Sequence, residues 1–215
     1  MFVELIEALR CPRPHEEAQL VASTSVTDAR HIVDGVLGCP VCGAEFKIAG
    51  GIAYFETPER QTPIEPPNAD LALRLAAFLD LSDARGFALL CGRWGAQLDG
   101  IRRLSETPIV LVNPPNDFAG DPAGVFVCGA TMPFAPGSIR CAALDGDMPQ
   151  SLIAAATRSV RRGGRVVGPA TLPVPDGVTV LDRDDLLWVG ERTGAPDAAL
   201  RLLTLTRAEP RAADS

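Results

Sequence analysis

The sequence predicts a mixed α/β chain in two parts: a small α+β metal-binding unit, then a Rossmann-like, mostly parallel sheet that ends in antiparallel strands. Cysteine and histidine residues gather in the first 43 positions, at spacings typical of a metal site. Beyond residue 68, short apolar runs alternate with helical patterns, as in a parallel sheet covered on both faces. Four prolines between residues 57 and 68 separate the two patterns, because proline fits neither a helix interior nor a central strand.

These patterns divide the chain into four segments. Residues 1–56 form the metal-binding unit, 57–68 a semi-stiff linker, 69–207 the larger α/β domain and 208–215 a tail. With 47% apolar residues in 215, the larger domain has enough material for a real core.

Charge and hydropathy argue against two kinds of partner. The net charge is −7, and residues 1–60 alone carry five basic and nine acidic side chains, so a basic footprint for nucleic acid is missing. No run approaches the ~18 apolar residues of a membrane span. The N-terminus carries Glu4 and Glu7 and is unlike a signal peptide, so we expect a cytoplasmic protein with reduced cysteines.

Four residues of the first unit are expected to hold one structural zinc: Cys11, His15, Cys39 and Cys42. The Cys39-Pro-Val-Cys42 spacing is that of a zinc knuckle, and Gly43 can adopt the positive φ that its tight turn requires. Cys11 adds a third thiolate, and His15 is the natural fourth ligand, with His31 in reserve. The alternative is a set of free or buried cysteines with a solvated histidine.

The elements around these ligands follow a regular order. Apolar residues at i, i+3, i+4 and i+7 predict a short amphipathic helix over residues 2–10. Alternating patterns and the Gly50-Gly51 turn predict four strands: 19–22, 31–37, 45–48 and 52–55.

This order, with Asp34-Gly-Val-Leu-Gly-Cys-Pro-Val-Cys-Gly43 and Gly51-Ile-Ala-Tyr-Phe55, resembles the small zinc-ribbon activator subunit of tRNA, rRNA and release-factor methyltransferases over residues 1–56. The resemblance implies a ribbon without catalytic residues that binds a protein partner, with a methyltransferase as the natural candidate. It also implies that a ribbon strand joins the edge of the partner's sheet. The sequence departs from the family at Pro14, which stands where a second thiolate could be.

Because the linker is short, we expect the ribbon to dock on its own chain. The contact should join the hairpin 46–55 to the strand 125–128.

The larger domain is expected to alternate helices and strands. Its helices cover residues 70–81, which Asn68 caps, 96–104 and 150–160. Five strands should be parallel: 87–91, 109–112, 125–128, 139–144 and 165–168. Three should complete one edge as antiparallel strands: 178–181, 186–189 and 200–206.

Four segments of this domain carry a further pattern: Leu89-Leu-Cys-Gly-Arg-Trp-Gly-Ala96, Val110-Leu-Val-Asn113, Cys128-Gly-Ala-Thr-Met-Pro-Phe134 and Ser159-Val-Arg-Arg-Gly-Gly-Arg-Val-Val167. Over residues 84–168 they resemble the class I S-adenosylmethionine-dependent methyltransferases. The resemblance implies that cofactor contacts fall to four positions: Gly92, Trp94, Gly95 and Asn113.

The chain departs from that family at the positions that bind the cofactor. Trp94 stands in place of a glycine, Asn113 in place of the acid that binds the ribose, and Ala130 offers no carboxylate to the adenine amino group. The loss of three polar contacts at roughly 1–3 kcal/mol each weakens binding by several orders of magnitude. We therefore expect S-adenosylmethionine binding to be eroded, with Trp94 filling the cleft and Asn113 near it.

The sequence thus predicts a methyltransferase-like protein with its own zinc ribbon, non-catalytic and acting as a protein-binding or regulatory scaffold. The alternative is an active S-adenosylmethionine-dependent methyltransferase on a small-molecule or protein substrate. A third class, a nucleic-acid-binding ribbon, is disfavoured by charge.

Two other patterns have simpler interpretations. Asn113-Pro-Pro-Asn116 resembles the Asn-Pro-Pro-aromatic motif of amino-group methyltransferases, but it follows the second strand and ends in asparagine. Four arginines at the end of a predicted helix are interpreted as compensating its dipole: Arg158, Arg161, Arg162 and Arg165.

Overall fold

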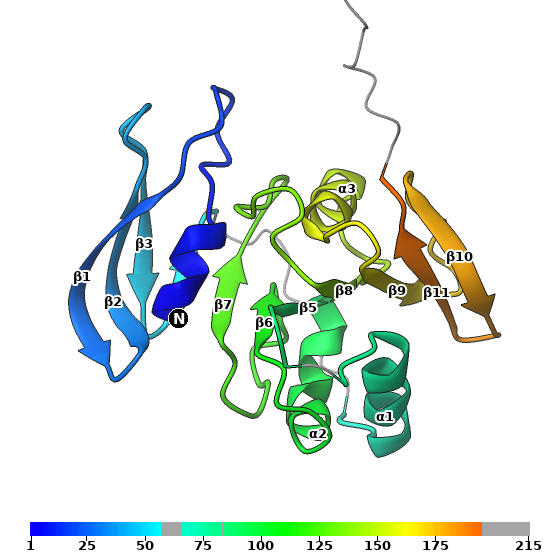
Figure 1. Ribbon diagram of the computed structural model, residues 1–215. Coiled ribbons are helices and arrows are strands. Elements are labelled where there is room, and N and C mark those ends of the chain that lie inside the picture. The colour runs from blue at the N-terminus through cyan, green and yellow to red at the C-terminus, as the bar shows by residue number, and fades with distance from the viewer. Residues whose placement is uncertain (57–65, 83, 195–215) are drawn as a thin grey trace, which may run out of the picture.

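The computed structural model describes residues 1–56, 66–82 and 84–194. Within them, eleven strands form one continuous sheet in the order β1-β2-β3-β4-β7-β6-β5-β8-β9-β11-β10 (Figure 1). The strands are β1 Val21–Asp28, β2 His31–Gly38, β3 Glu45–Ala49, β4 Ile52–Tyr54, β5 Ala88–Cys91, β6 Ile109–Val112, β7 Gly124–Val127, β8 Cys141–Ala143, β9 Arg165–Pro169, β10 Val178–Arg183 and β11 Leu187–Arg192. The first four come from the metal-binding unit, so the two predicted parts share one sheet.

The larger domain has the predicted fold class. Strands β7, β6, β5, β8 and β9 pair in parallel, whereas β11 is antiparallel to β9 and β10 is antiparallel to β11. All residues of β5 and β6 are buried, because an apolar layer covers each face of the sheet. One layer joins Leu89 and Val110 to α3 (Gln150–Ser159), and the other joins Leu90 and Leu111 to α1 (Ala69–Phe78) and α2 (Leu98–Arg102).

The N-terminal unit, residues 1–56, is called the ribbon below. It pairs with the sheet of the larger domain at the predicted contact. Strand β4 pairs in parallel with β7, with Ile52 opposite Val125, Ala53 opposite Phe126 and Tyr54 opposite Val127. The N–H of Phe55 then donates to the carbonyl of Val127 at 2.9 Å. The predicted pairing of the hairpin with strand 125–128 is therefore confirmed, and it satisfies the edge of β7 through main-chain hydrogen bonds.

The ribbon also covers one face of β7. The connections 113–123 and 128–140 on either side of β7 contain no helix. Instead the 3-10 helix η1 (Val3–Ala8) lies beside β7, and Leu5 and Leu9 are fully buried in the same apolar cluster as Phe126 (Figure 1). A Cβ on Gly124 would lie only 2.8 Å from a methyl carbon of Leu5, so glycine is needed for this close approach.

Helix boundaries differ from the sequence expectations in three places, the first being α1, which ends at Phe78 rather than at residue 81. The predicted helix 2–10 is the shorter η1, because Leu9 and Arg10 leave it to form bridges with Phe134 and Gln19. The predicted helix 96–104 is split into a 3-10 turn, η2 (Gly92–Gln97), and α2. Asn68 caps α1 as predicted, since its side chain accepts from the N–H groups of Asp70 and Leu71 at 3.0 and 3.1 Å. No helix in the described part of the chain has the length and apolarity to cross a bilayer.

The first strand is longer than the predicted 19–22. Its outer part, residues 23–28, is mostly serine and threonine, is exposed throughout and pairs with β2 in antiparallel register. The side chains therefore carry no strand periodicity. The expected strand 200–206, the tail 208–215 and residues 57–65 of the linker lie outside the described residues.

Candidate functional site

The structure brings together the four predicted metal ligands. Their ligand atoms all lie within 4.8 Å of one another, and the set is Cys11, His15, Cys39 and Cys42. Cys11 and His15 come from the loop after η1, and the two other cysteines come from the turn between β2 and β3. This donor set can hold a metal ion.

The spacing of the donors suits a tetrahedral site. The two sulfur atoms of Cys11 and Cys42 are 3.8 Å apart, and the Cys39 sulfur is 3.4 Å from His15 Nε2. Arms of ~2.3 Å to sulfur and ~2.05 Å to nitrogen at tetrahedral angles give ~3.8 Å between two sulfurs and ~3.5 Å between sulfur and nitrogen. The observed distances agree with these values.

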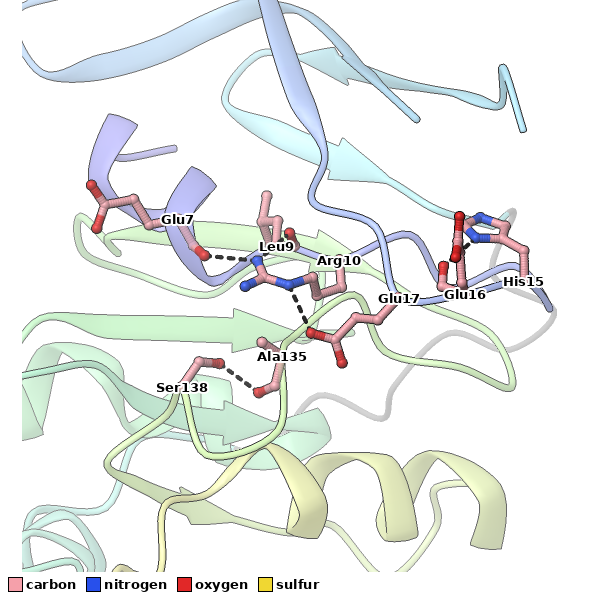
Figure 2. Close-up of polar contacts among 8 residues, drawn as sticks. All are labelled: Glu7, Leu9, Arg10, His15, Glu16, Glu17, Ala135 and Ser138. Carbon is pink, nitrogen blue, oxygen red and sulfur yellow. Dashed lines mark hydrogen bonds and ion pairs between the residues drawn. The ribbon is translucent and has the colours of Figure 1, made fainter. Parts of the chain in front are cut away.

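The loop that carries His15 is fixed by hydrogen bonds (Figure 2). Arg10 pairs with Glu17 at 3.1 Å, and the N–H of Cys11 donates to the carbonyl of Ala18 at 2.9 Å, so the two ends of the loop are joined. His15 Nδ1 lies 2.5 Å from the carbonyl oxygen of Glu16. Because a carbonyl can only accept, Nδ1 carries the proton, and the lone pair of Nε2 faces the cysteines.

The knuckle has the expected turn. Gly43 has a φ of +69°, and its N–H donates to the carbonyl of Cys39 at 3.0 Å. Burial raises the pKa of the Cys39 thiol, but the backbone N–H groups of Cys42 and Val41 outweigh it and hold the pKa at about 6. Burial raises the pKa of Cys11 to about 11. A thiolate therefore forms most easily at Cys39, where two amides stabilise it.

The structure does not place the reserve candidate His31 with these four residues. It begins β2, and its ring packs edge-on against Phe2 with 4.3 Å between the ring centroids. It lines a cavity of about 390 Å³ near the amino end of β7, together with Asp121 and Val125.

The second candidate site lies where the carboxyl ends of the parallel strands meet. We call this end of the sheet the carboxyl edge. The order β7-β6-β5-β8-β9 reverses direction between β5 and β8, and ligands of doubly wound sheets bind at such a reversal. Gly92, Trp94 and Gly95 follow β5, and Asn113 follows β6. All four predicted cofactor positions therefore lie at this edge.

Asp145 occupies the centre of this edge. Its side chain is buried, accepts from the N–H of Arg93 at 2.8 Å and forms an ion pair with Arg93 Nε at 3.3 Å. Gly92 has a φ of +58°, and a Cβ there would lie 2.1 Å from Asp145 Oδ2. No motif in the sequence assigns Asp145 a role at this edge. Its position directly after the predicted strand 139–144 was the available signal.

Trp94 and the prolines after β6 fill the adjoining space. The indole N–H of Trp94 donates to the carbonyl of Leu144 at 2.7 Å, and the side chain is buried. Trp94 thus links the end of β5 to the end of β8. A Cβ on Gly95 would lie 2.8 Å from Pro114 Cβ, so the loop after β6 sits directly on the turn after β5.

Asn113 uses both ends of its amide within the chain. Its Nδ2 donates to the carbonyl of Cys128 at 2.7 Å, and its Oδ1 accepts from the N–H of Cys128 at 2.8 Å. This reciprocal pair needs one donor and one acceptor, which asparagine offers and an aspartate does not. The pair explains why an amide stands at the end of β6.

Replacement of Asn113 by aspartate should therefore lower the free energy of unfolding by about 1–3 kcal/mol, because a carboxylate would face the Cys128 carbonyl. Asn113 has a φ of +49°, a conformation that aspartate also tolerates, so backbone strain does not confound the comparison. Urea unfolding is the measurement, and Asn116→Asp, an exposed residue of the same loop, is the matched control. Equal stability of the two variants would contradict the pairing.

The ribbon contributes a carboxylate to the same edge. Because β4 runs parallel to β7, its end brings Glu56 to the loop after β7. Glu56 Oε2 accepts from the N–H of Ala130 at 3.2 Å, and a Cβ on Gly129 would lie 1.3 Å from that oxygen. Glu56 could not be predicted from the sequence, because only the pairing of β4 with β7 brings it here.

No protein family and no curated protein matches this sequence. The cyclase SpnF is 15% identical over 53% of this chain and 58% of its own, with a TM-score of 0.41, so this chain spans little more than half of it. A 1,6-didemethyltoxoflavin-N1-methyltransferase from Burkholderia thailandensis is 11% identical over 80% of this chain and all of its own, with a TM-score of 0.40. A putative methyltransferase from Escherichia coli is 12% identical over 62% of this chain and 92% of its own, with a TM-score of 0.38. The strand order and pairings define a mixed α/β fold with a mostly parallel central sheet and antiparallel C-terminal strands.

Proposed function

We propose that this chain is a non-catalytic scaffold: a methyltransferase-like domain that carries its own zinc ribbon and works by binding another protein. The observation that carries this proposal is that polar side chains at the carboxyl edge already bond to other groups of the same chain. The Asn113 amide is paired with Cys128, the Trp94 indole with Leu144 and the Asp145 carboxylate with Arg93. A nucleoside cofactor would have to break several of these contacts to bind.

The residues at this edge do not fit S-adenosylmethionine. The ribose diol of a nucleoside requires acceptors for two hydroxyl hydrogens, whereas the Asn113 oxygen already accepts from Cys128 and keeps one lone pair at most. In nucleotide-binding sheets, a glycine-rich turn lets the backbone approach the ligand closely. Here Trp94 and Pro114 occupy that turn and the loop beside it. No catalytic step is therefore assigned to this edge.

We further propose that zinc occupies the Cys/His cluster and is structural. A small ribbon has little core of its own, and three thiolates with one imidazole are a common closed coordination set for zinc. With four protein ligands, no position remains for a substrate or an activated water.

Isothermal titration of the zinc-loaded protein with S-adenosylmethionine and S-adenosylhomocysteine tests the proposal. We expect no saturable heat with either ligand up to roughly millimolar concentration, since the lost contacts weaken binding by several orders of magnitude. Stoichiometric binding at micromolar concentration would favour the alternative function, an active methyltransferase.

A further inference from the structure

Three arginines crowd together where α3 and β11 end. Arg158 lies in the last turn of α3, and Arg162 follows one turn later. Arg192, the last residue of β11, donates from Nη1 to the carbonyl of Val160, which caps α3. A Cβ on Gly194 would lie 3.0 Å from Arg162 Nε and 3.4 Å from its Cζ, so the Arg162 guanidinium lies over the chain just after Arg192. We call Arg158, Arg162 and Arg192 the arginine corner.

No carboxylate of the described residues pairs with the arginine corner. Within residues 1–56, 66–82 and 84–194, none of the three guanidiniums forms an ion pair. The same part of the chain pairs five other arginines with acids: Arg10–Glu17, Arg30–Glu4, Arg74–Asp184, Arg93–Asp145 and Arg103–Asp99. What distinguishes the corner is that three arginines without an acidic partner among the described residues lie close together, in a chain of net charge −7.

The helix dipole accounts for only part of this arrangement. Arg158 and the contact of Arg192 with the Val160 carbonyl both place positive charge at the C-terminus of α3, which is favourable. The proximity of three positive charges is itself unfavourable. Burial lowers the pKa of Arg192, and the neighbouring charges of Arg162 and Arg158 lower it further. Arg158 and Arg162 are exposed, so their guanidiniums are available to a partner.

We propose that the arginine corner is a docking surface for an acidic segment of a partner protein. Guanidinium groups bind carboxylates through two parallel hydrogen bonds, and arginine is enriched at protein interfaces. A short segment with two or three carboxylates matches the three charges. A long polyanion such as nucleic acid would meet net negative charge over both halves of the chain. This proposal rests on the scaffold function proposed above and defines the chemistry of its partner.

The test uses fluorescence anisotropy on the zinc-loaded full chain with two probes, a labelled hexaglutamate peptide and a labelled thymidine oligonucleotide. The variant is Arg158→Glu with Arg162→Glu. The matched control is Arg30→Glu with Arg103→Glu, which changes the net charge equally on exposed side chains of the turn between β1 and β2 and of the residue that follows α2. We expect the peptide to bind at low salt, and its Kd to rise at least about tenfold in the corner variant but by no more than about twofold in the control.

Three results would overturn the proposal. They are an equal loss of peptide binding in the control, no binding of the peptide to the wild-type chain at low salt, and tighter binding of the oligonucleotide than of the peptide. Retained zinc and a single cooperative thermal transition in the corner variant show that it is folded, even where the lost helix-dipole interaction of Arg158 lowers the melting temperature slightly. Titration with S-adenosylhomocysteine separates the two proposals, because binding of that ligand would defeat the scaffold function and leave the peptide result standing.

Discussion

Replacement of Cys39 by serine should release the metal and unfold the ribbon. Cys39 is buried, its sulfur faces His15, and the amides of Val41 and Cys42 stabilise its thiolate. Structural zinc contributes ~10–16 kcal/mol to small zinc-finger peptides, which is comparable to the whole ~5–15 kcal/mol that typically stabilises a domain. Loss of the metal should therefore separate β2 from β3 and expose the edge of β7.

Metal analysis and thermal unfolding measure this effect. We expect about one zinc per wild-type chain and less than half an equivalent in Cys39→Ser, with a much lower melting temperature. His31→Ala is the control, because His31 packs on Phe2 and should keep the metal. The assignment fails if Cys39→Ser retains a full equivalent of zinc, or if wild-type protein prepared without oxygen contains less than half an equivalent.

Truncation of Leu9 to alanine should destabilise the whole molecule rather than the ribbon alone. Leu9 is fully buried, forms a bridge with Phe134 and shares an apolar cluster with Phe126 of β7. Leucine-to-alanine changes in cores cost about 2–5 kcal/mol. Because the ribbon and the larger domain share one sheet, this loss should appear in the unfolding of both.

Urea unfolding followed by tryptophan fluorescence reads the larger domain, since Trp94 and Trp188 both lie there. We expect one transition that coincides with zinc release and moves to lower urea in Leu9→Ala. Val3→Ala is the control, because Val3 lies on the same 3-10 helix but is 41% exposed and should change stability by less than about 0.5 kcal/mol. A tryptophan transition that Leu9→Ala leaves unchanged would mean that the two parts unfold independently.

Much of the architecture follows from patterns that are local in sequence. The buried runs at β5 and β6 are apolar throughout because both faces of the sheet are covered, and that composition identified them. The four metal ligands were predicted because zinc restricts residue type and spacing. The docking of β4 on β7 was also expected, and the pairing confirms it.

The contacts at the carboxyl edge depend on tertiary structure and could not be predicted from the sequence. The second hydrogen bond of the Asn113 amide requires the register of β6 against β7. Glu56 reaches Ala130 only because β4 runs parallel to β7. The outer part of β1 is polar and pairs through its backbone, so its side chains gave no signal. Sequence patterns locate strands and ligands, whereas these contacts depend on which strand ends lie next to one another in the folded sheet.

Hydrogen exchange at two backbone amides tests most directly whether the carboxyl edge is closed by the chain itself. The N–H of Arg93 donates to the Asp145 carboxylate, and the N–H of Cys128 donates to the Asn113 side chain. We expect both amides in the zinc-loaded protein to exchange at least on the order of 100-fold more slowly than in an unfolded chain, with no change on addition of S-adenosylhomocysteine. Fast exchange at both amides in the free protein, with protection appearing only when S-adenosylhomocysteine is added, would contradict the account and show an open cofactor site.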